Sequence, residues 1–128
     1  MLWTLSKNFT PPFDVIESGD QITVLVEIAG MQSEDFSINL MNRHLIISGT
    51  RRRPPVGGTA YHRVEIGFGE FRLDIPLPWT VEQDKVNAVY REGFLQIDLP
   101  RRAEQHIPVA GTDKQVNTAE RDKSLDDQ

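Results

Sequence analysis

Apolar and polar residues alternate along most of the chain between residues 14 and 100. The clearest alternation runs from Gln21 to Ile28, where one face is apolar and the other is mostly polar. The apolar face consists of Ile22, Val24, Val26 and Ile28. A repeat of two residues is typical of a half-buried β-strand, so this segment is predicted to be one.

Shorter segments with the same character follow at spacings of about ten residues, which favours a β-sandwich. The further predicted strands are residues 36–40, 45–48, 71–77, 86–90 and 94–99. Asn42-Arg43 and Arg91-Glu92-Gly93 are predicted turns, with Gly93 supplying a positive φ. Residues 33–35 and 81–85 are predicted to form single helical turns, because neither segment is long enough for a helix. The fold class is therefore all-β.

The composition divides the chain into three regions: an arm at 1–13, a β-sandwich domain at 14–100 and a tail at 101–128. Pro11-Pro12 prevents a helix from continuing through the arm. The sizeable apolar residues of the tail are Ile107, Val109, Val116 and Leu125. So little apolar surface cannot order a tail, which is expected to be flexible apart from one tripeptide.

That tripeptide is Ile107-Pro108-Val109. Proline holds the segment extended, so Ile107 and Val109 point the same way. Burying each side chain gains at most about 1.5–3 kcal/mol, and ordering the tail costs several kcal/mol in return. One docking event is therefore weak and reversible, while several tails in a closed assembly provide avidity. The tripeptide is predicted to anchor the tail in a groove of a β-sandwich on another subunit.

Composition and charge exclude several other roles. Cysteine is absent, which excludes disulfides, thiol nucleophiles and thiolate metal sites. The net charge of −5 disfavours nucleic acid as a partner. Arg51-Arg52-Arg53 is interpreted as a solvated loop, because no aromatic residues interleave with it to stack bases. The sequence shows no signal peptide and no membrane span, so we expect a cytoplasmic protein.

The sequence contains no recognisable pattern of catalytic or metal-binding residues. His44, His62 and His106 lie far apart and share no carboxylate at the spacing of metal ligands. The serines lie in no nucleophile elbow, and there is no Gly-rich phosphate loop. Glu65 and Glu70 form a conceivable acid/base pair, but glutamates on a surface strand are usually solvated charges. We therefore predict a protein without catalytic residues, metal or cofactor, whose function is binding.

Several motifs in order resemble the α-crystallin domain of small heat-shock proteins. The resemblance covers roughly residues 14 to 109. The order and spacing of the motifs together make it specific. The motifs are Asp14-Val15, Ile28-Ala29-Gly30-Met31, Gly69-Glu70-Phe71 running to Leu77-Pro78, Ala88-Val89-Tyr90-Arg91-Glu92-Gly93-Phe94-Leu95, Leu99-Pro100-Arg101 and Ile107-Pro108-Val109. The last is similar to the family's C-terminal I-x-I/V anchor.

The resemblance implies an immunoglobulin-like sandwich of seven or eight strands. It also implies an ATP-independent holdase, a stress-response chaperone that binds partly unfolded client proteins and keeps them from aggregating. The building block would be a dimer, from which larger homo-oligomers form. In bacterial, archaeal and plant members, a long loop carries a strand that pairs with the partner subunit. Here the loop would be Arg51 to Phe68 and the swapped strand Tyr61-His62-Arg63-Val64-Glu65, pairing with the partner's edge around Asp14 to Glu17.

The resemblance also assigns the other contacts of an assembly. The anchor would dock between two strands, 36–40 and 86–90. The candidate groove residues are Ile38, Leu40, Asn87 and Val89. Ordinary core packing explains Ile38 and Leu40 equally well. The candidate client-binding residues of the arm are Trp3, Leu5, Phe9 and Phe13, which alternatively pack on their own domain.

The chain departs from the family pattern in three places. Ala29-Gly30 replaces the usual Pro-Gly, and Leu73 occupies a position where the family usually has Arg, with Arg72 one residue earlier. The third departure is the short arm, which favours a smaller or less regular oligomer or weaker holdase activity. An alternative function is a co-chaperone of the p23 type, an adaptor sandwich that binds one specific protein. That alternative predicts a monomer without the loop strand or the anchor.

Overall fold

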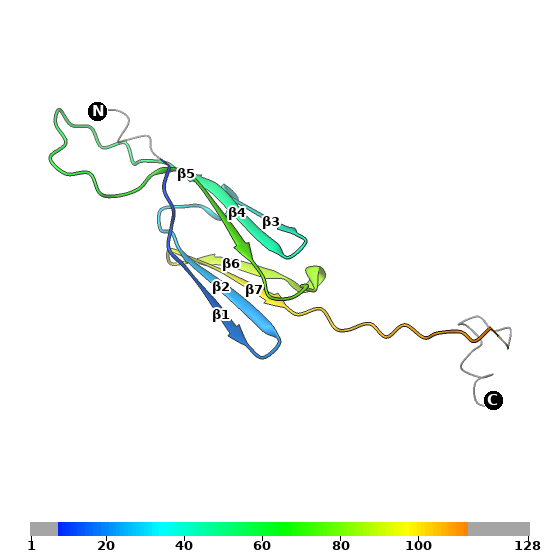
Figure 1. Ribbon diagram of the computed structural model, residues 1–128. Helices are drawn as coiled ribbons and strands as arrows, with labels where there is room; N and C mark the ends of the chain where they lie inside the picture. Colours follow the sequence, from blue (N-terminus) through cyan, green and yellow to red (C-terminus); the bar gives the residue numbers. More distant parts are fainter. Residues whose placement is uncertain (1–7, 113–128) are drawn as a thin grey trace.

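The computed structural model describes residues 8–112, in which seven strands form two antiparallel sheets stacked face to face (Figure 1). The strands are β1 Phe13–Ser18, β2 Gln21–Glu27, β3 Phe36–Met41, β4 His44–Arg51, β5 Gly69–Pro76, β6 Asn87–Arg91 and β7 Phe94–Pro100. The order is β1-β2-β7-β6 in one sheet and β3-β4-β5 in the other. The predicted all-β sandwich is confirmed. The predicted helical turns appear as short 3-10 segments, η2 Ser33–Asp35 and η3 Gln83–Lys85.

The core lies between the two sheets and is built mainly from alternate residues of β2, β4, β5 and β7. In the antiparallel register, Val24 of β2 lies opposite Ile97 of β7, and both side chains are fully buried. Two stacked sheets whose inner faces interdigitate form a core in this way. The other buried residues of the strands include Ile22, Val26, Leu45, Ile47, Phe71, Leu73, Ile75, Leu95 and Leu99. The alternation in the sequence therefore predicted correctly which residues of β2 and β5 face inward.

The hairpin between β6 and β7 fixes the register of both strands. Arg91 lies opposite Phe94, so only Glu92 and Gly93 form the turn. Their φ angles are +55° and +84°, as a tight hairpin turn of mirror-image type requires. A Cβ at Gly93 would lie 3.3 Å from the Cβ of Ala29, which makes the site crowded as well. The predicted role of Gly93 is confirmed.

Three segments leave the sandwich: residues 8–12 before β1, residues 52–68 between β4 and β5, and residues 102–112 after β7 (Figure 1). The long loop and the tail project from opposite ends of the sandwich, with the tail running beyond the end of β7. No helix within residues 8–112 is long and apolar enough to cross a membrane. The folded strands therefore act as a platform that holds three extensions in defined places.

Candidate assembly and client-binding surfaces

Strand β1 forms one edge of the four-stranded sheet, and all six of its residues are exposed. Phe13 and Val15 lie opposite Val26 and Val24 of β2, so they are on the inner side of the sheet. They are nevertheless 39% and 44% exposed, because the narrower three-stranded sheet does not cover them. An edge strand with free N–H and C=O groups and apolar side chains is a template for pairing with another strand. This is the edge that the sequence analysis assigned to the partner.

The predicted swapped strand lies in the loop of residues 52–68, which forms no strand in the single subunit. Tyr61 is 52% exposed, and every residue from 61 to 65 is exposed. Within the loop, Arg63 forms an ion pair with Glu65, the Nη1–Oε2 distance being 3.1 Å. The loop therefore presents the predicted segment to solvent on a projection beyond β4 and β5 (Figure 1). Its pairing with a partner stays a prediction.

The tail is fixed at its base and exposed at the predicted anchor. The N–H of Arg101 donates to the carbonyl of Asp20, and that of Arg102 to the carbonyl of Thr80, each at 2.8 Å. Beyond this point the chain has no regular structure as far as residue 111. Ile107 and Val109 are 77% and 81% exposed. Two branched apolar side chains thus stand in solvent on a segment whose start is held to the domain.

The four predicted groove residues do not share one surface. Ile38 and Leu40 of β3 lie opposite Ile47 and Leu45 of β4, face the interior and are half-buried against the core. Asn87 and Val89 of β6 face the opposite way, because it is their neighbours Ala88 and Tyr90 that pair with buried residues of β7. The prediction that Asn87 and Val89 lie with Ile38 and Leu40 is therefore wrong.

The side of β6 that faces β3 carries apolar residues that were not among the predicted groove residues. The ring of Tyr90 lies 5.1 Å from that of Phe36 on β3, which brings the two edge strands together. The Tyr90 hydroxyl donates to the carbonyl of Ile28 at 2.8 Å and accepts from the N–H of Met31 at 3.3 Å, so the ring is held in place. Val86 also packs against the core. The apolar edge on this side is therefore formed by Phe36, Ile38, Leu40, Val86 and Tyr90, which we call the β3/β6 edge.

The sequence contained a signal for this arrangement. A two-residue turn at Glu92-Gly93 places Tyr90 opposite Leu95 and Ala88 opposite Ile97. Leu95 and Ile97 belong to the alternating apolar face of β7, so their partners on β6 must also face inward. The apolar run Ala88-Val89-Tyr90 obscured this parity, because it shows no alternation of its own.

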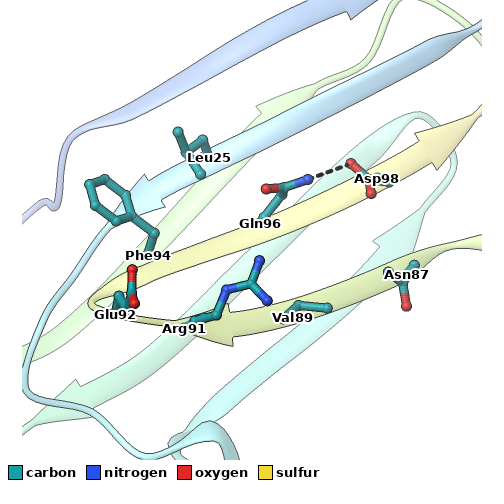
Figure 2. A pocket seen from close by; sticks show the side chains of 8 residues that line it. All are labelled: Leu25, Asn87, Val89, Arg91, Glu92, Phe94, Gln96 and Asp98. Atoms are coloured by element: carbon teal, nitrogen blue, oxygen red, sulfur yellow. Dashed lines mark hydrogen bonds between the residues drawn. The ribbon is translucent and has the colours of Figure 1, made fainter.

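Asn87 and Val89 instead line a shallow hollow on the outer face of the four-stranded sheet (Figure 2). The hollow has a volume of about 440 Å³ and is also lined by Leu25, Arg91, Glu92, Phe94, Gln96 and Asp98. Its apolar side chains include Val89 and Phe94, which are 41% and 43% exposed. The Nε2 of Gln96 donates to Asp98 at 3.3 Å on the polar side. This is a mixed surface without the side chains of β3.

The structure describes two of the four candidate client-binding residues, Phe9 and Phe13. Trp3 and Leu5 lie outside the described residues. Phe9 packs against the core, with its ring centroid 5.6 Å from that of Phe71, so it favours the alternative of packing on its own domain. Phe13 begins β1 and remains accessible.

The surroundings of the arginine cluster differ from the predicted solvated loop without neighbouring aromatic rings. Phe9 and Phe68 do lie against the arginine cluster, with the guanidinium of Arg51 4.6 Å and 5.2 Å from their ring centroids. Arg53 covers Phe68 as well, at 4.5 Å, so the protein's own arginines occupy the ring faces that would stack bases.

Leu73, at the family's arginine position, is buried in the core. It makes no charged contact in this chain.

The comparisons with known proteins agree with this architecture. The model of the Hsp20/alpha crystallin family matches residues 14–117. Small heat shock protein C2 of Rickettsia felis is 31% identical over 97 residues, which are 75% of this chain and 63% of that protein. A probable 15 kDa heat shock protein of Leptospira interrogans is 30% identical over 96 residues, 75% of this chain and 73% of that protein.

Solved structures show the same sandwich. Heat shock protein 16.0 from Schizosaccharomyces pombe superposes with a TM-score of 0.67 at 25% identity, covering 80% of this chain and 100% of that one. A small heat-shock protein from Xylella fastidiosa gives a TM-score of 0.68 at 25% identity, covering 82% and 100%. The family match, the curated relatives and the fold agree over the whole sandwich, and the chain belongs to the Hsp20/alpha crystallin family.

Proposed function

We propose that this chain is an ATP-independent holdase that binds partly unfolded proteins and prevents their aggregation, working as a homo-oligomer built from dimers. The observation that carries the proposal is the apolar surface that a single subunit leaves exposed on its tail and on its β1 edge. Ile107 and Val109 are more than three-quarters exposed, and β1 presents apolar side chains on a free edge. Such surface is unfavourable in water and marks sites of association. Membership of the small heat-shock protein family supports the same function.

The dimer forms in this proposal when residues 61–65 of one subunit add a strand to β1 of another. Strand addition supplies main-chain hydrogen bonds to an edge that has free donors and acceptors. The reciprocal exchange of both loops would pair the free main-chain groups around Asp14 to Glu17 of both β1 strands. Replacing residues 54–66 by a short Gly-Ser linker removes the strand and retains Arg51 and Gly67 at the loop's base. The expected product is a folded monomer in sedimentation velocity, and a persistent dimer would refute the swapped strand.

The tail links dimers in this proposal by placing Ile107 and Val109 on the β3/β6 edge of a neighbouring subunit. This edge is apolar and half-buried, so docking would remove further apolar area from water. Each link is weak, which suits an assembly that exchanges subunits. The published structure of the Xylella fastidiosa relative reveals a distinct high order structure for that protein. In this chain, the tail is the candidate connector between dimers.

Client proteins would contact the apolar residues of the arm and of β1. Phe13 is accessible in the structure, and Trp3 and Leu5 add apolar side chains to the sequence of the arm. Phe9 is partly buried against its own domain, so we do not place a client contact there. We therefore place client contacts at Trp3, Leu5 and Phe13.

The holdase activity is tested by light scattering of a model protein heated to aggregation, without ATP, with and without this chain. We expect suppression of scattering at an equimolar ratio of subunits to client. An unrelated protein of the same mass serves as the control. Unchanged scattering at that ratio, with the chain itself folded and in solution, would refute the proposal.

A further inference from the structure

One side chain lies where the loop, the arm and the end of β2 meet. Arg51 is the last residue of β4, directly before the loop of residues 52–68. Its Nε and Nη2 both donate to the carbonyl of Gly67, with Nε at 3.1 Å, so it ties the start of the loop to its end. Its Nη1 donates to the carbonyl of Ala29 at 3.0 Å. A single guanidinium thereby joins the loop's base to the turn that follows β2.

The arm crosses the same point. The Arg51 guanidinium lies over the Phe9 ring, 4.6 Å from its centroid, and over the Phe68 ring, 5.2 Å from its centroid. The N–H of Phe9 donates to the carbonyl of Glu70 at 3.3 Å, and this hydrogen bond joins the arm to the start of β5. A charged guanidinium near two ring faces gains cation–π energy while its N–H groups remain hydrogen-bonded.

Gly67 provides the space for this crossing. A Cβ at residue 67 would lie 2.7 Å from the Cβ of Phe9, closer than real Cβ contacts. The φ of Gly67 is not in the left-handed region, so the steric contact with Phe9 is the constraint that the structure shows at this position. The absence of a side chain at residue 67 therefore allows the arm to pack directly on the loop. We call the contact of Arg51, Phe9, Gly67 and Phe68 the loop clamp.

The rest of the loop has few restraints of its own. Residues 54–66 are exposed and form neither helix nor strand. The direction in which the loop leaves the sandwich is therefore set at its base. A strand held in the direction of its partner loses less conformational freedom on pairing than one on a freely moving loop.

We propose that Arg51 is a positioning residue for dimer formation, which it promotes by clamping the arm and the base of the loop together. This inference rests on the proposed function, because it assumes that residues 61–65 pair with a second copy of the chain. Release of Phe9 from the clamp then loosens the dimer. Subunits therefore exchange faster when the arm is detached from the loop than when Phe9 is packed in the clamp.

The test measures subunit exchange of the full-length protein by native mass spectrometry, after ¹⁵N-labelled and unlabelled chains are mixed. Arg51→Ala is expected to accelerate exchange about tenfold, as the loss of charge-assisted and cation–π contacts predicts. Arg51→Lys keeps the charge but loses the planar fork, so its rate should remain closer to that of Arg51→Ala. Arg52→Ala is the matched control, because it removes the same charge from an exposed neighbour and should exchange like the wild type.

A double variant tests whether Arg51 and Phe9 act through one contact. Phe9→Ala should accelerate exchange by itself, and the double variant with Arg51→Ala should be no faster than the faster single variant, because both substitutions open one clamp. Exchange at the wild-type rate in Arg51→Ala, or fully additive effects in the double variant, would overturn the inference. If Arg51→Ala does not fold, Gly67→Ala displaces Phe9 with Arg51 intact, and unchanged exchange in that variant overturns it equally.

Failure of the clamp and failure of the proposed dimer give different results. If the chain with residues 54–66 replaced remains a dimer, the swapped strand is wrong and the inference falls with it. If that chain is a monomer while Arg51→Ala exchanges at the wild-type rate, the dimer is supported and only the clamp is refuted.

Discussion

The replacement of Ile107 and Val109 by alanine tests whether the tail holds dimers together. The two side chains are 77% and 81% exposed in the single subunit, so nearly all of their apolar area is available for burial on a neighbour. At about 0.8 kcal/mol for each apolar carbon buried, the five carbons that the double substitution removes are worth about 4 kcal/mol when fully buried. About four-fifths of their area is exposed and can be buried on docking, so the substitution removes about 3 kcal/mol from each docked tail. That loss weakens each link about 100-fold. Several links act together in one assembly, so the larger oligomer should dissociate to dimers.

Sizing chromatography with light scattering measures the outcome over a range of concentrations. We expect the double variant to elute as a dimer under conditions in which the wild type is larger. Glu104→Ala with Gln105→Ala is the matched control, because it changes two exposed polar residues of the same tail. Thermal unfolding should be unchanged in both variants, since neither pair of side chains belongs to the core. A double variant of wild-type size, or a control that dissociates equally, would refute the anchor.

The remaining predictions concern the domain and the surface on which the anchor docks. Gly93→Val forces a β-branched residue to a φ of +84° and a Cβ to 3.3 Å from that of Ala29, so chemical denaturation should show a loss of about 2–3 kcal/mol. A loss below half a kcal/mol would show that the turn relaxes freely. Ile38→Thr on the β3/β6 edge should weaken the oligomer in sizing chromatography, while Val89→Thr on the outer face should leave its size unchanged. The reverse result would place the docking site in the outer hollow.

The sequence predicted much of the core because several strands alternate. On β2, Ile22, Val24 and Val26 share one face, and the other face is mostly polar. A strand with one buried face cannot change its register without exposing its apolar residues. The turn at Glu92-Gly93 was predictable for a related reason, because glycine readily adopts the positive φ that a tight turn requires. Both features depend only on residues that are close together in the sequence, so they can be predicted without knowing the fold.

The surfaces were harder to predict because they depend on contacts between distant segments. Val89 lies between two other apolar residues, so its direction was set only by pairing with Gln96 on β7. Phe9 is covered because Gly67 leaves space for it, and the two are far apart in the sequence. Arg51 looked like one of three solvated arginines, although its hydrogen bonds join the loop, the arm and the turn after β2. No local pattern contains these contacts.

The central claim is that this chain holds partly unfolded proteins in solution. The most direct measurement heats a client with the chain, without ATP, and separates the soluble fraction by size. The account predicts that the client elutes with the chain in a soluble complex larger than either protein alone. A client found entirely in the pellet, with the chain at its own size in the supernatant, would contradict it.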